Sequence, residues 1–180
     1  MEIAIEKRDV ERMLHEAPSK VTLGTMRALN RSIASGRTLM ARNVAADLGV
    51  RVGDVRERIK LSEAEPNRLV ARMATGLRPR LPIIDFRARA PEPSRGKGRG
   101  VTYRIGKQAR RLPHAFIATM ANGHRGVFMR DAAARLPITE RFGPSLGRVF
   151  LKFAKEVKAR TVEQFSKNLL SELKFRLRQK

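Results

Sequence analysis

The sequence contains no cysteine, no tryptophan and a single tyrosine among its 180 residues. Without cysteine the chain can form no disulfide, no thiolate metal site and no cysteine nucleophile. Aromatic residues make up only 5% of the chain, so the core must be mostly aliphatic, and single-stranded nucleic acid would find few stacking partners. The three histidines, His15, His114 and His124, have neither metal-ligand spacing nor an acidic cluster beside them. We therefore expect no metal site.

Long apolar runs are also absent. No run approaches the roughly 20 residues of a membrane-spanning helix, and the N-terminus lacks the apolar segment of a signal peptide. We expect a soluble protein that is made in the cytoplasm and has no membrane partner. Paired carboxylates are scarce, since Asp85 and Asp131 stand apart, and there is no Gly-x-Ser-x-Gly motif. These absences predict no catalytic residue, no cofactor and no enzyme.

Acidic residues are few relative to basic ones: 39 Lys and Arg face 17 Asp and Glu, which gives a net charge of +22. Such an excess indicates a polyanionic neighbour, whether nucleic acid, an acidic protein surface or anionic lipid. The excess is greatest over residues 76–130, with 13 basic and 2 acidic residues. Within that part, Ser94–Gly100 reads SRGKGRG, which is as typical of a solvated flexible linker as of a phosphate-contacting loop. The basic residues expected to face DNA or another polyanion are Arg95, Lys97, Arg99, Lys107, Arg110 and Arg111.

The chain length is that of one domain. We expect a single domain over residues 1–180 with a helical part (1–60), a β-rich part (61–143) that contains the basic loop 91–100, and a C-terminal helix (144–180).

Apolar positions at helical spacing predict a long helix over Lys20–Leu48, with Ser19 as its N-cap and Gly49 at its end. A shorter helix is expected over Lys7–Glu16.

The β-rich part begins where helical spacing gives way to alternation. Arg68–Thr75 alternates like a strand. Prolines then interrupt the pattern, so Leu81–Phe86 and Arg87–Ala90 are expected to be short edge strands. Val101–Ile105 alternates again and is expected to pair with Arg87–Ala90, followed by a basic turn over Gly106–Arg111.

A hairpin is predicted between the apolar runs Phe116–Met120 and Val127–Arg130. Asn-Gly is the strongest short hairpin signal because both residues tolerate positive φ. The motif comprises Asn122, Gly123, His124, Arg125 and Gly126.

A long C-terminal helix is predicted from about Ser145 onward. At ~30 residues it would be ~45 Å long, more than a small domain can cover, so part of its apolar face is expected to pack against another subunit. The candidates for this packing are Phe153, Val157, Phe165, Leu169 and Leu173. With helices at both ends and an antiparallel sheet with hairpins between them, the fold class is α+β.

The order and spacing of five segments resemble those of the phage and prophage minor tail protein Z family, also called tail completion proteins. The segments are Leu81–Phe86, Pro113–Met120, Gly123–Phe128, Leu136–Ile138 and Phe142–Ser145. The resemblance implies a virion protein that completes the head-proximal end, or neck, of a phage tail. The implied partners are the tail terminator, the head–tail connector and the tape measure protein. It also implies a homo-hexameric ring, and it transfers no catalytic residue. If each copy in such a ring turned a few basic residues inward, the lumen would hold phage DNA without sequence readout. The same residues could instead face an acidic tail terminator.

Two other functions remain open. Arg51–Lys60 contains Asp54 and Glu57 at capping-box spacing, which predicts a short helix through Lys60. A long helix, a glycine-containing turn and a short basic helix together outline a helix-turn-helix, so the alternative is a stand-alone nucleic-acid-binding protein. A third hypothesis is an assembly factor that is absent from the finished particle.

Overall fold

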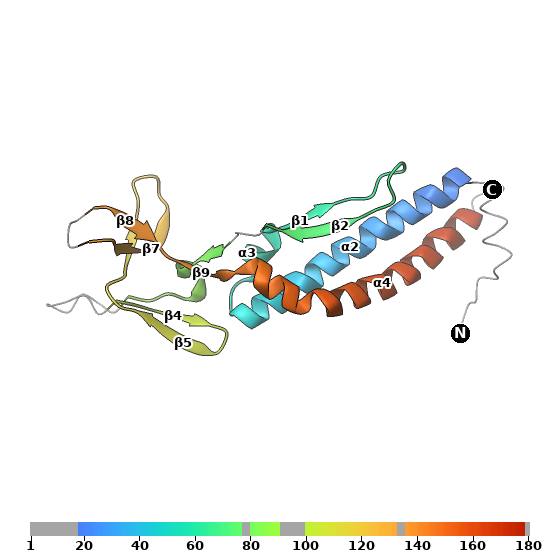
Figure 1. Cartoon of the computed structure of the whole chain (residues 1–180). Coiled ribbons are helices and arrows are strands. Elements are labelled where there is room, and N and C mark those ends of the chain that lie inside the picture. The colour runs from blue at the N-terminus through green and yellow to red at the C-terminus, as the bar shows by residue number, and fades with distance from the viewer. Residues whose placement is uncertain (1–17, 77–79, 91–99, 133–135, 179–180) are drawn as a thin grey trace. The chain divides into compact units, whose positions relative to one another are not determined.

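The computed structural model describes residues 18–76, 80–90, 100–132 and 136–178. Along the sequence, one long helix precedes all the strands and another follows them, so the predicted α+β fold is confirmed (Figure 1). The expected central sheet is divided into four small sheets, β1–β2, β3–β9, β4–β5 and β6–β7–β8. The elements are α2 (Pro18–Leu48), α3 (Val52–Glu57), β1 (Ile59–Ser62), β2 (Arg72–Thr75), β3 (Arg80–Pro82), the 3-10 helix η1 (Ile83–Phe86), β4 (Val101–Ile105), β5 (Gln108–Leu112), β6 (Phe116–Thr119), β7 (Arg125–Arg130), β8 (Ile138–Glu140), β9 (Phe142–Ser145) and α4 (Leu146–Arg178).

The described residues group into two compact units, each built from separate stretches of the chain. Unit 1 takes its residues from Met1–Met40, Ile59–Ala74 and Ala154–Lys180, and unit 2 from Ala41–Arg58 and Thr75–Phe153. Among the described helices, none is both long and apolar enough to cross a bilayer. The predicted Lys7–Glu16 helix lies outside the described residues.

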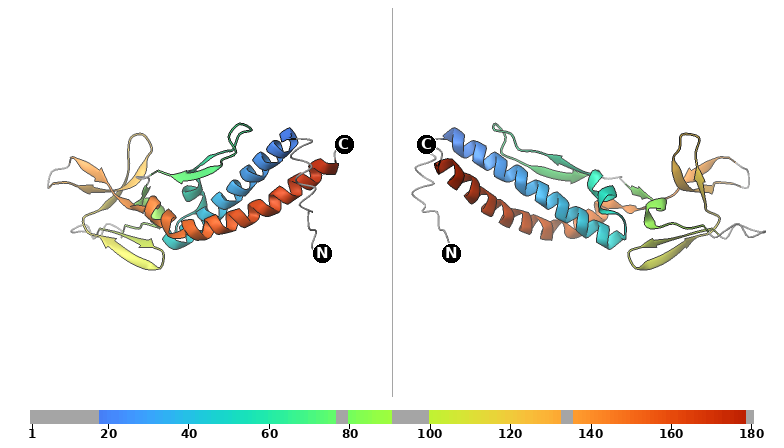
Figure 2. Two further views of the ribbon diagram at one scale, coloured as in Figure 1. Left: turned by 45° about the vertical axis from the view of Figure 1, so that its right-hand side comes forward. Right: turned by 180° about the vertical axis from the view of Figure 1, so that it is seen from behind.

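In unit 1, α2 and α4 pack side by side along a row of small residues on α2 (Figures 1 and 2). Gly24, Ala28, Ser32 and Gly36 follow one another at four-residue steps and are all buried, because residues four apart share a helix face. Small side chains allow a close approach of the two helices: a Cβ added at Gly36 would lie 2.5 Å from the Oγ1 of Thr161. Gly36 is therefore a point of close contact between α2 and α4.

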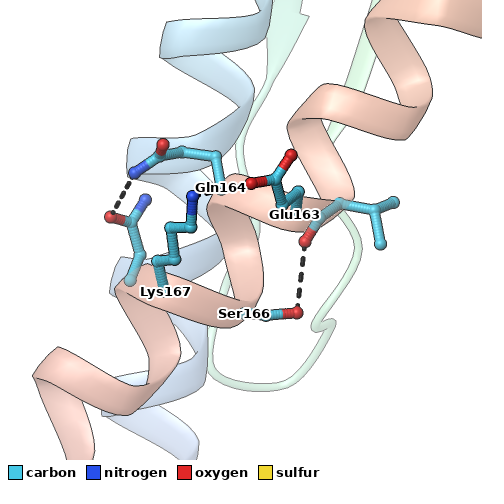
Figure 3. Close-up of polar contacts among 6 residues, drawn as sticks. Glu163, Gln164, Ser166 and Lys167 are labelled. Carbon is cyan, nitrogen blue, oxygen red and sulfur yellow. Dashed lines mark hydrogen bonds and ion pairs between the residues drawn. The ribbon is translucent and has the colours of Figure 1, made fainter. Parts of the chain in front are cut away.

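A hydrogen-bonded chain of polar side chains crosses this helix pair. The Asn168 amide donates to the Ser32 hydroxyl at 2.8 Å, and that hydroxyl donates to the Ala28 carbonyl at 2.6 Å. The Gln164 amide donates to Asn168 Oδ1 at 3.1 Å (Figure 3). Ser32 and Asn168 are only 2% and 5% exposed, and buried polar groups of this kind are tolerated because each one has a partner.

A side-chain amide of α2 holds the β1–β2 hairpin, which runs beside that helix (Figures 1 and 2). The side chain of Asn30 donates to the Ala64 carbonyl at 3.0 Å and accepts from the Ala64 N–H at 2.7 Å. It thus satisfies both main-chain groups of a buried residue, as a neighbouring strand would.

The core of unit 2 is mostly aliphatic, as the scarcity of aromatic residues predicts, although Phe86 and Phe128 are also buried in it. Ile83, Val101, Ala115 and Val127 form a buried cluster. Residues from η1, β4 and the β6–β7 hairpin meet here because alternate residues of a strand face one side of the sheet.

The predicted hairpin around Asn122 and Gly123 is confirmed: β6 pairs with β7 from Phe116 opposite Phe128 to Thr119 opposite Arg125. Of Asn122 and Gly123, only Gly123 has a positive φ, at 81°. Asn122 instead accepts a hydrogen bond from the His124 N–H through its side chain at 3.0 Å, which closes an Asx turn.

Two predicted helix caps are wrong. The helix α2 begins at Pro18, so Ser19 lies inside its first turn, and proline fits there because the first N–H groups of a helix have no partner within it. In α3 the N-cap is Arg51 without a side-chain hydrogen bond, and Asp54 lies in the first turn. The helix ends at Glu57, and Ile59 already belongs to β1.

The strand pairing expected after residue 80 is also partly wrong. Leu81–Phe86 is not one strand, since β3 ends at Pro82 and η1 follows. The main partner of β4 is β5, and Arg87–Ala90 contributes only a bridge between Arg89 and Thr102. The expected basic turn is shorter, because Gln108 already pairs with Ile105.

One other expectation is confirmed in full and one in part. The C-terminal helix is confirmed over 33 residues, Leu146–Arg178. Of the strand predicted over Arg68–Thr75, the second half is formed by β2.

Candidate polyanion-binding surface

The six basic residues singled out from the sequence fall into two groups. Arg95, Lys97 and Arg99 lie outside the described residues, as does most of the loop 91–100. Lys107 lies in the turn between β4 and β5, whereas Arg110 and Arg111 lie on β5 and are exposed.

The structure adds two arginines beside this group. Arg89 bridges to Thr102, and Thr102 is the cross-strand partner of Arg111. These three residues therefore form a row across the hairpin, since directly paired residues lie on the same face of a sheet. Arg104 lies two residues along β4 from Thr102 and shares that face. We call Arg89, Arg104 and Arg111, all exposed, the arginine face.

The opposite face of the hairpin holds the residues that anchor it. Val101 is buried in the unit 2 core, and Tyr103 and Leu112 pack against it. Because strand residues alternate between faces, these anchors keep the arginine face in solvent.

The arginine face has little opposing charge. Residues 100–130 include six Lys and Arg and no Asp or Glu. Within the described ranges, neither Arg89 nor Arg104 has a carboxylate at ion-pair distance. Neighbouring like charges on a sheet repel one another, so a polyanion bound here would relieve that repulsion.

The hairpin motif has a structural explanation. His124 Nε2 lies 2.9 Å from Glu140 Oε1, and its ring stands edge-on to Phe128 with centroids 6.4 Å apart. A Cβ at Gly126 would lie 2.6 Å from the same Glu140 oxygen. Of the five motif residues, Arg125 is exposed and lines a hollow beside β6. This position indicates a role other than stabilising the hairpin.

The residues proposed for subunit packing differ in burial. Val157 and Leu173 are 1% and 5% exposed within the chain itself, whereas Phe153, Phe165 and Leu169 are half-buried. Subunit packing through them stays a prediction. Four exposed apolar residues of α4 were not singled out from the sequence because they lie off its regular stripe: Leu151, Val162, Leu170 and Phe175.

A depression of about 410 Å³ in unit 2 brings together charges of both signs. Its lining includes Arg51, Asp54, Asp85 and Arg87. Burial raises the pKa of Asp85 above its ordinary value of 3.8, and the nearby Asp54 carboxylate raises it further, against Arg58 and Arg51, which lower it. In the described part of the chain, no three His, Asp or Glu residues are grouped to hold a metal ion.

Replacing Asp85 by Asn is expected to stabilise the protein near neutral pH. A carboxyl whose pKa is raised on folding favours the folded state only while it is protonated, so its contribution is lost as pH rises through the folded pKa. The free energy of unfolding of Asp85→Asn should therefore exceed that of the wild type increasingly as pH rises above 3.8. Urea titrations across the pH range measure this difference, with the exposed Glu57→Gln as control; a constant difference would contradict the pKa shift.

Comparison with known proteins agrees with the five segments noted in the sequence. The family model described as prophage minor tail protein Z (GPZ) matches residues 7–180. No curated protein and no solved structure matches the chain. The match spans both units and all thirteen described elements. The chain therefore belongs to the prophage minor tail protein Z family and is a structural component of a phage tail.

Proposed function

We propose that this tail protein completes the head-proximal end of the tail and helps to join the tail to the head and to position the DNA. The family supports a place in the tail. The arginine face is the observation that carries the DNA-positioning part, because it presents exposed cations, held in fixed order by strand pairing, to a polyanion.

A hexameric ring would multiply this charge. In a closed ring each side chain recurs once per subunit, and ring closure uses two different complementary patches. Six copies of Arg104 and Arg111 turned inward would give the lumen a strong positive potential. DNA would be held there through its phosphates, without sequence readout.

The same assembly requires protein partners. A ring at the head-proximal end would contact the tail terminator and the head–tail connector. Its inner surface would contact the tape measure protein. This role needs no cofactor and no catalysis, and we assign the protein no enzymatic activity.

The alternative, a stand-alone nucleic-acid-binding protein, retains support from the charge of the chain but not from its local structure. The segment read as a recognition helix is only the six residues Val52–Glu57, and β1 follows almost at once. The helix also carries Asp54 and Glu57, which would face phosphates unfavourably.

The position in the particle is tested by labelling a C-terminal tag in purified particles and imaging them by electron microscopy. Label at the head–tail junction is the result expected for a resident neck protein. Particles without label, with the protein left bound to nucleic acid in the lysate, would overturn the proposal in favour of the alternative. Loss of the label from finished particles but not from assembly intermediates would identify an assembly factor.

Reversing the charge of Arg104 and Arg111 to Glu is expected to uncouple DNA handling from assembly. Particles should form in normal number, but infectivity should fall on the order of 100-fold, because phosphate contacts dominate DNA affinity. For the purified protein, the slope of log affinity against log salt should become shallower by about 2, one for each phosphate that the variant no longer binds.

The matched control reverses Lys155 and Lys158, which are exposed on α4 and change the net charge by the same amount. The control variant should keep infectivity and most of the salt slope. Equal losses in both variants would show that net charge alone, and not the arginine face, governs DNA handling.

A further inference from the structure

A hollow of about 610 Å³ in unit 2 lies between the strand β6 and the segment of residues 88–90. Its lining consists of Ala88, Arg89, Ala90, Ile117, Ala118, Thr119 and Arg125. Most of these side chains are small, so the walls of the hollow consist largely of main chain.

One wall is the open edge of a sheet. In the order β6–β7–β8, the strand β6 pairs on one side only among the residues that the structure describes. Met120 donates its N–H to the His124 carbonyl at 2.8 Å, so Met120 and, by alternation, Ala118 direct their main-chain groups to β7. Ile117 and Thr119 therefore direct theirs outward.

The pairing on the far side of β7 gives the same alternation. Arg141 donates its N–H to the Val127 carbonyl at 2.8 Å, so Val127 faces away from β6. Its neighbours Gly126 and Phe128 must then face β6, where they pair with Ala118 and Phe116.

The other wall also presents main-chain groups. Both the N–H and the carbonyl of Arg89 bond to Thr102, at 2.8 and 2.9 Å. The outward groups of Ala88 and Ala90 thus point away from β4. The hollow therefore offers donors and acceptors of the kind that an added strand uses.

The chemistry of this edge suits a peptide better than a nucleic acid. The outward carbonyls of Ile117 and Thr119 are acceptors, which phosphate oxygens cannot pair with, whereas a strand supplies a donor for each of them. Arg89 and Arg125 are exposed and line the same hollow, so acidic side chains on that strand would be favoured. A second copy of this chain is disfavoured as the source, because it carries the same net charge of +22.

We infer that the free edge of β6 receives an extended acidic segment of another virion protein, which adds to the sheet as a strand beside Ile117 and Thr119. The inference rests on the proposed place of the protein within the assembled tail. It assigns a protein-binding role to the hollow, with Arg89 at its edge, and leaves DNA to Arg104 and Arg111 of the arginine face.

Hydrogen exchange on assembled particles tests this pairing. Amide exchange of Phe116–Thr119 should be at least about tenfold slower in headless, DNA-free tails than in the free protein, because outward N–H groups gain partners. Unchanged exchange in tails that contain the protein would overturn the inference and leave the proposed function intact. Protection only in DNA-filled particles would overturn it in favour of a nucleic-acid site. Absence of the protein from tails would refute the proposed function as well.

A proline at position 119 tests strand addition at the free edge of β6 separately from the stability of the fold. The N–H of Thr119 points outward, so Thr119→Pro removes a donor for the added strand while the ladder to β7 stays intact, as prolines at sheet edges do. Incorporation of Thr119→Pro into tails should fall about tenfold, whereas Thr119→Val, which keeps the N–H, should be incorporated normally.

Arg125→Glu provides a second variant that does not depend on tolerance of proline. Arg125→Glu should also lower incorporation into tails, and Arg125→Lys should restore it. Arg125 has no side-chain partner among the described residues, so its replacement should not unfold the sheet. Normal incorporation of both Thr119→Pro and Arg125→Glu would overturn the inference.

Discussion

Replacing Gly100 by Ala is expected to destabilise the protein by about 3–5 kcal/mol, in the range of the most disruptive single substitutions. Gly100 has φ of +76°, and a Cβ there would lie 2.1 Å from the Leu112 carbonyl oxygen and 2.9 Å from the Cα of Pro113. Neither neighbour is a flexible side chain, so the backbone at the end of the β4–β5 hairpin must move apart. Urea denaturation of the purified protein measures the loss.

Gly123→Ala is the matched control for this substitution. Gly123 has nearly the same φ, +81°, but nothing lies within 4 Å of an added Cβ. It should cost only about 1 kcal/mol, the usual penalty of a left-handed conformation for a residue with a side chain. If the two variants were equally stable, the close approach at Gly100 would not be a constraint on the fold.

The second large effect is expected at Gly36, where the two long helices are in close contact. Alanine has the higher helix propensity by about 1 kcal/mol, but at position 36 its Cβ would lie 2.5 Å from the Thr161 Oγ1. That hydroxyl donates to the Val157 carbonyl at 2.7 Å, so rotating it away breaks a hydrogen bond. We expect Gly36→Ala to lower the free energy of unfolding by about 1–3 kcal/mol, the usual effect of overpacking.

A double-mutant cycle with Thr161→Ala tests the cause. The Cβ of Thr161 lies 3.5 Å from the added Cβ, an ordinary contact, so Gly36→Ala should be nearly harmless once the hydroxyl and methyl groups of Thr161 are removed. The coupling energy should be about 1–2 kcal/mol. Gly53→Ala in α3, with nothing within 4 Å, is the control and should be neutral or stabilising. Additive effects at positions 36 and 161 would contradict this packing.

The long elements could be predicted from the sequence because their signals repeat over many turns. Apolar residues recur along α2 and α4 through 31 and 33 residues, so one misread position changes little. The short α3 has no such redundancy. Asp54 and Glu57 have the spacing of a capping box, yet β1 begins at Ile59, because tertiary contacts override local propensity in a segment this short.

Part of the candidate binding surface could be predicted from the composition of the chain. Composition alone indicates that the middle of the chain faces a polyanion, and Lys107 and Arg111 do lie on an exposed hairpin. The part played by Arg89 depends on its pairing with Thr102, 13 residues further along the chain. The sequence predicts that the segments containing these two residues pair, but it does not show which of their residues lie opposite one another, so neither Arg89 nor Arg104 was assigned to the surface in advance.

The buried contact between Asn168 and Ser32 has a consequence for how the two helices are aligned along their axes. One turn to either side of Ser32, α2 presents Ala28 and Gly36, neither of which has a side-chain acceptor. If α4 slid by one turn, about 5.4 Å, the Asn168 amide would be buried without that partner, at a cost of about 1–3 kcal/mol. The apolar contacts along a stripe of small residues would tolerate several such alignments, whereas this one amide selects a single one. It thereby fixes the length over which the two helices overlap.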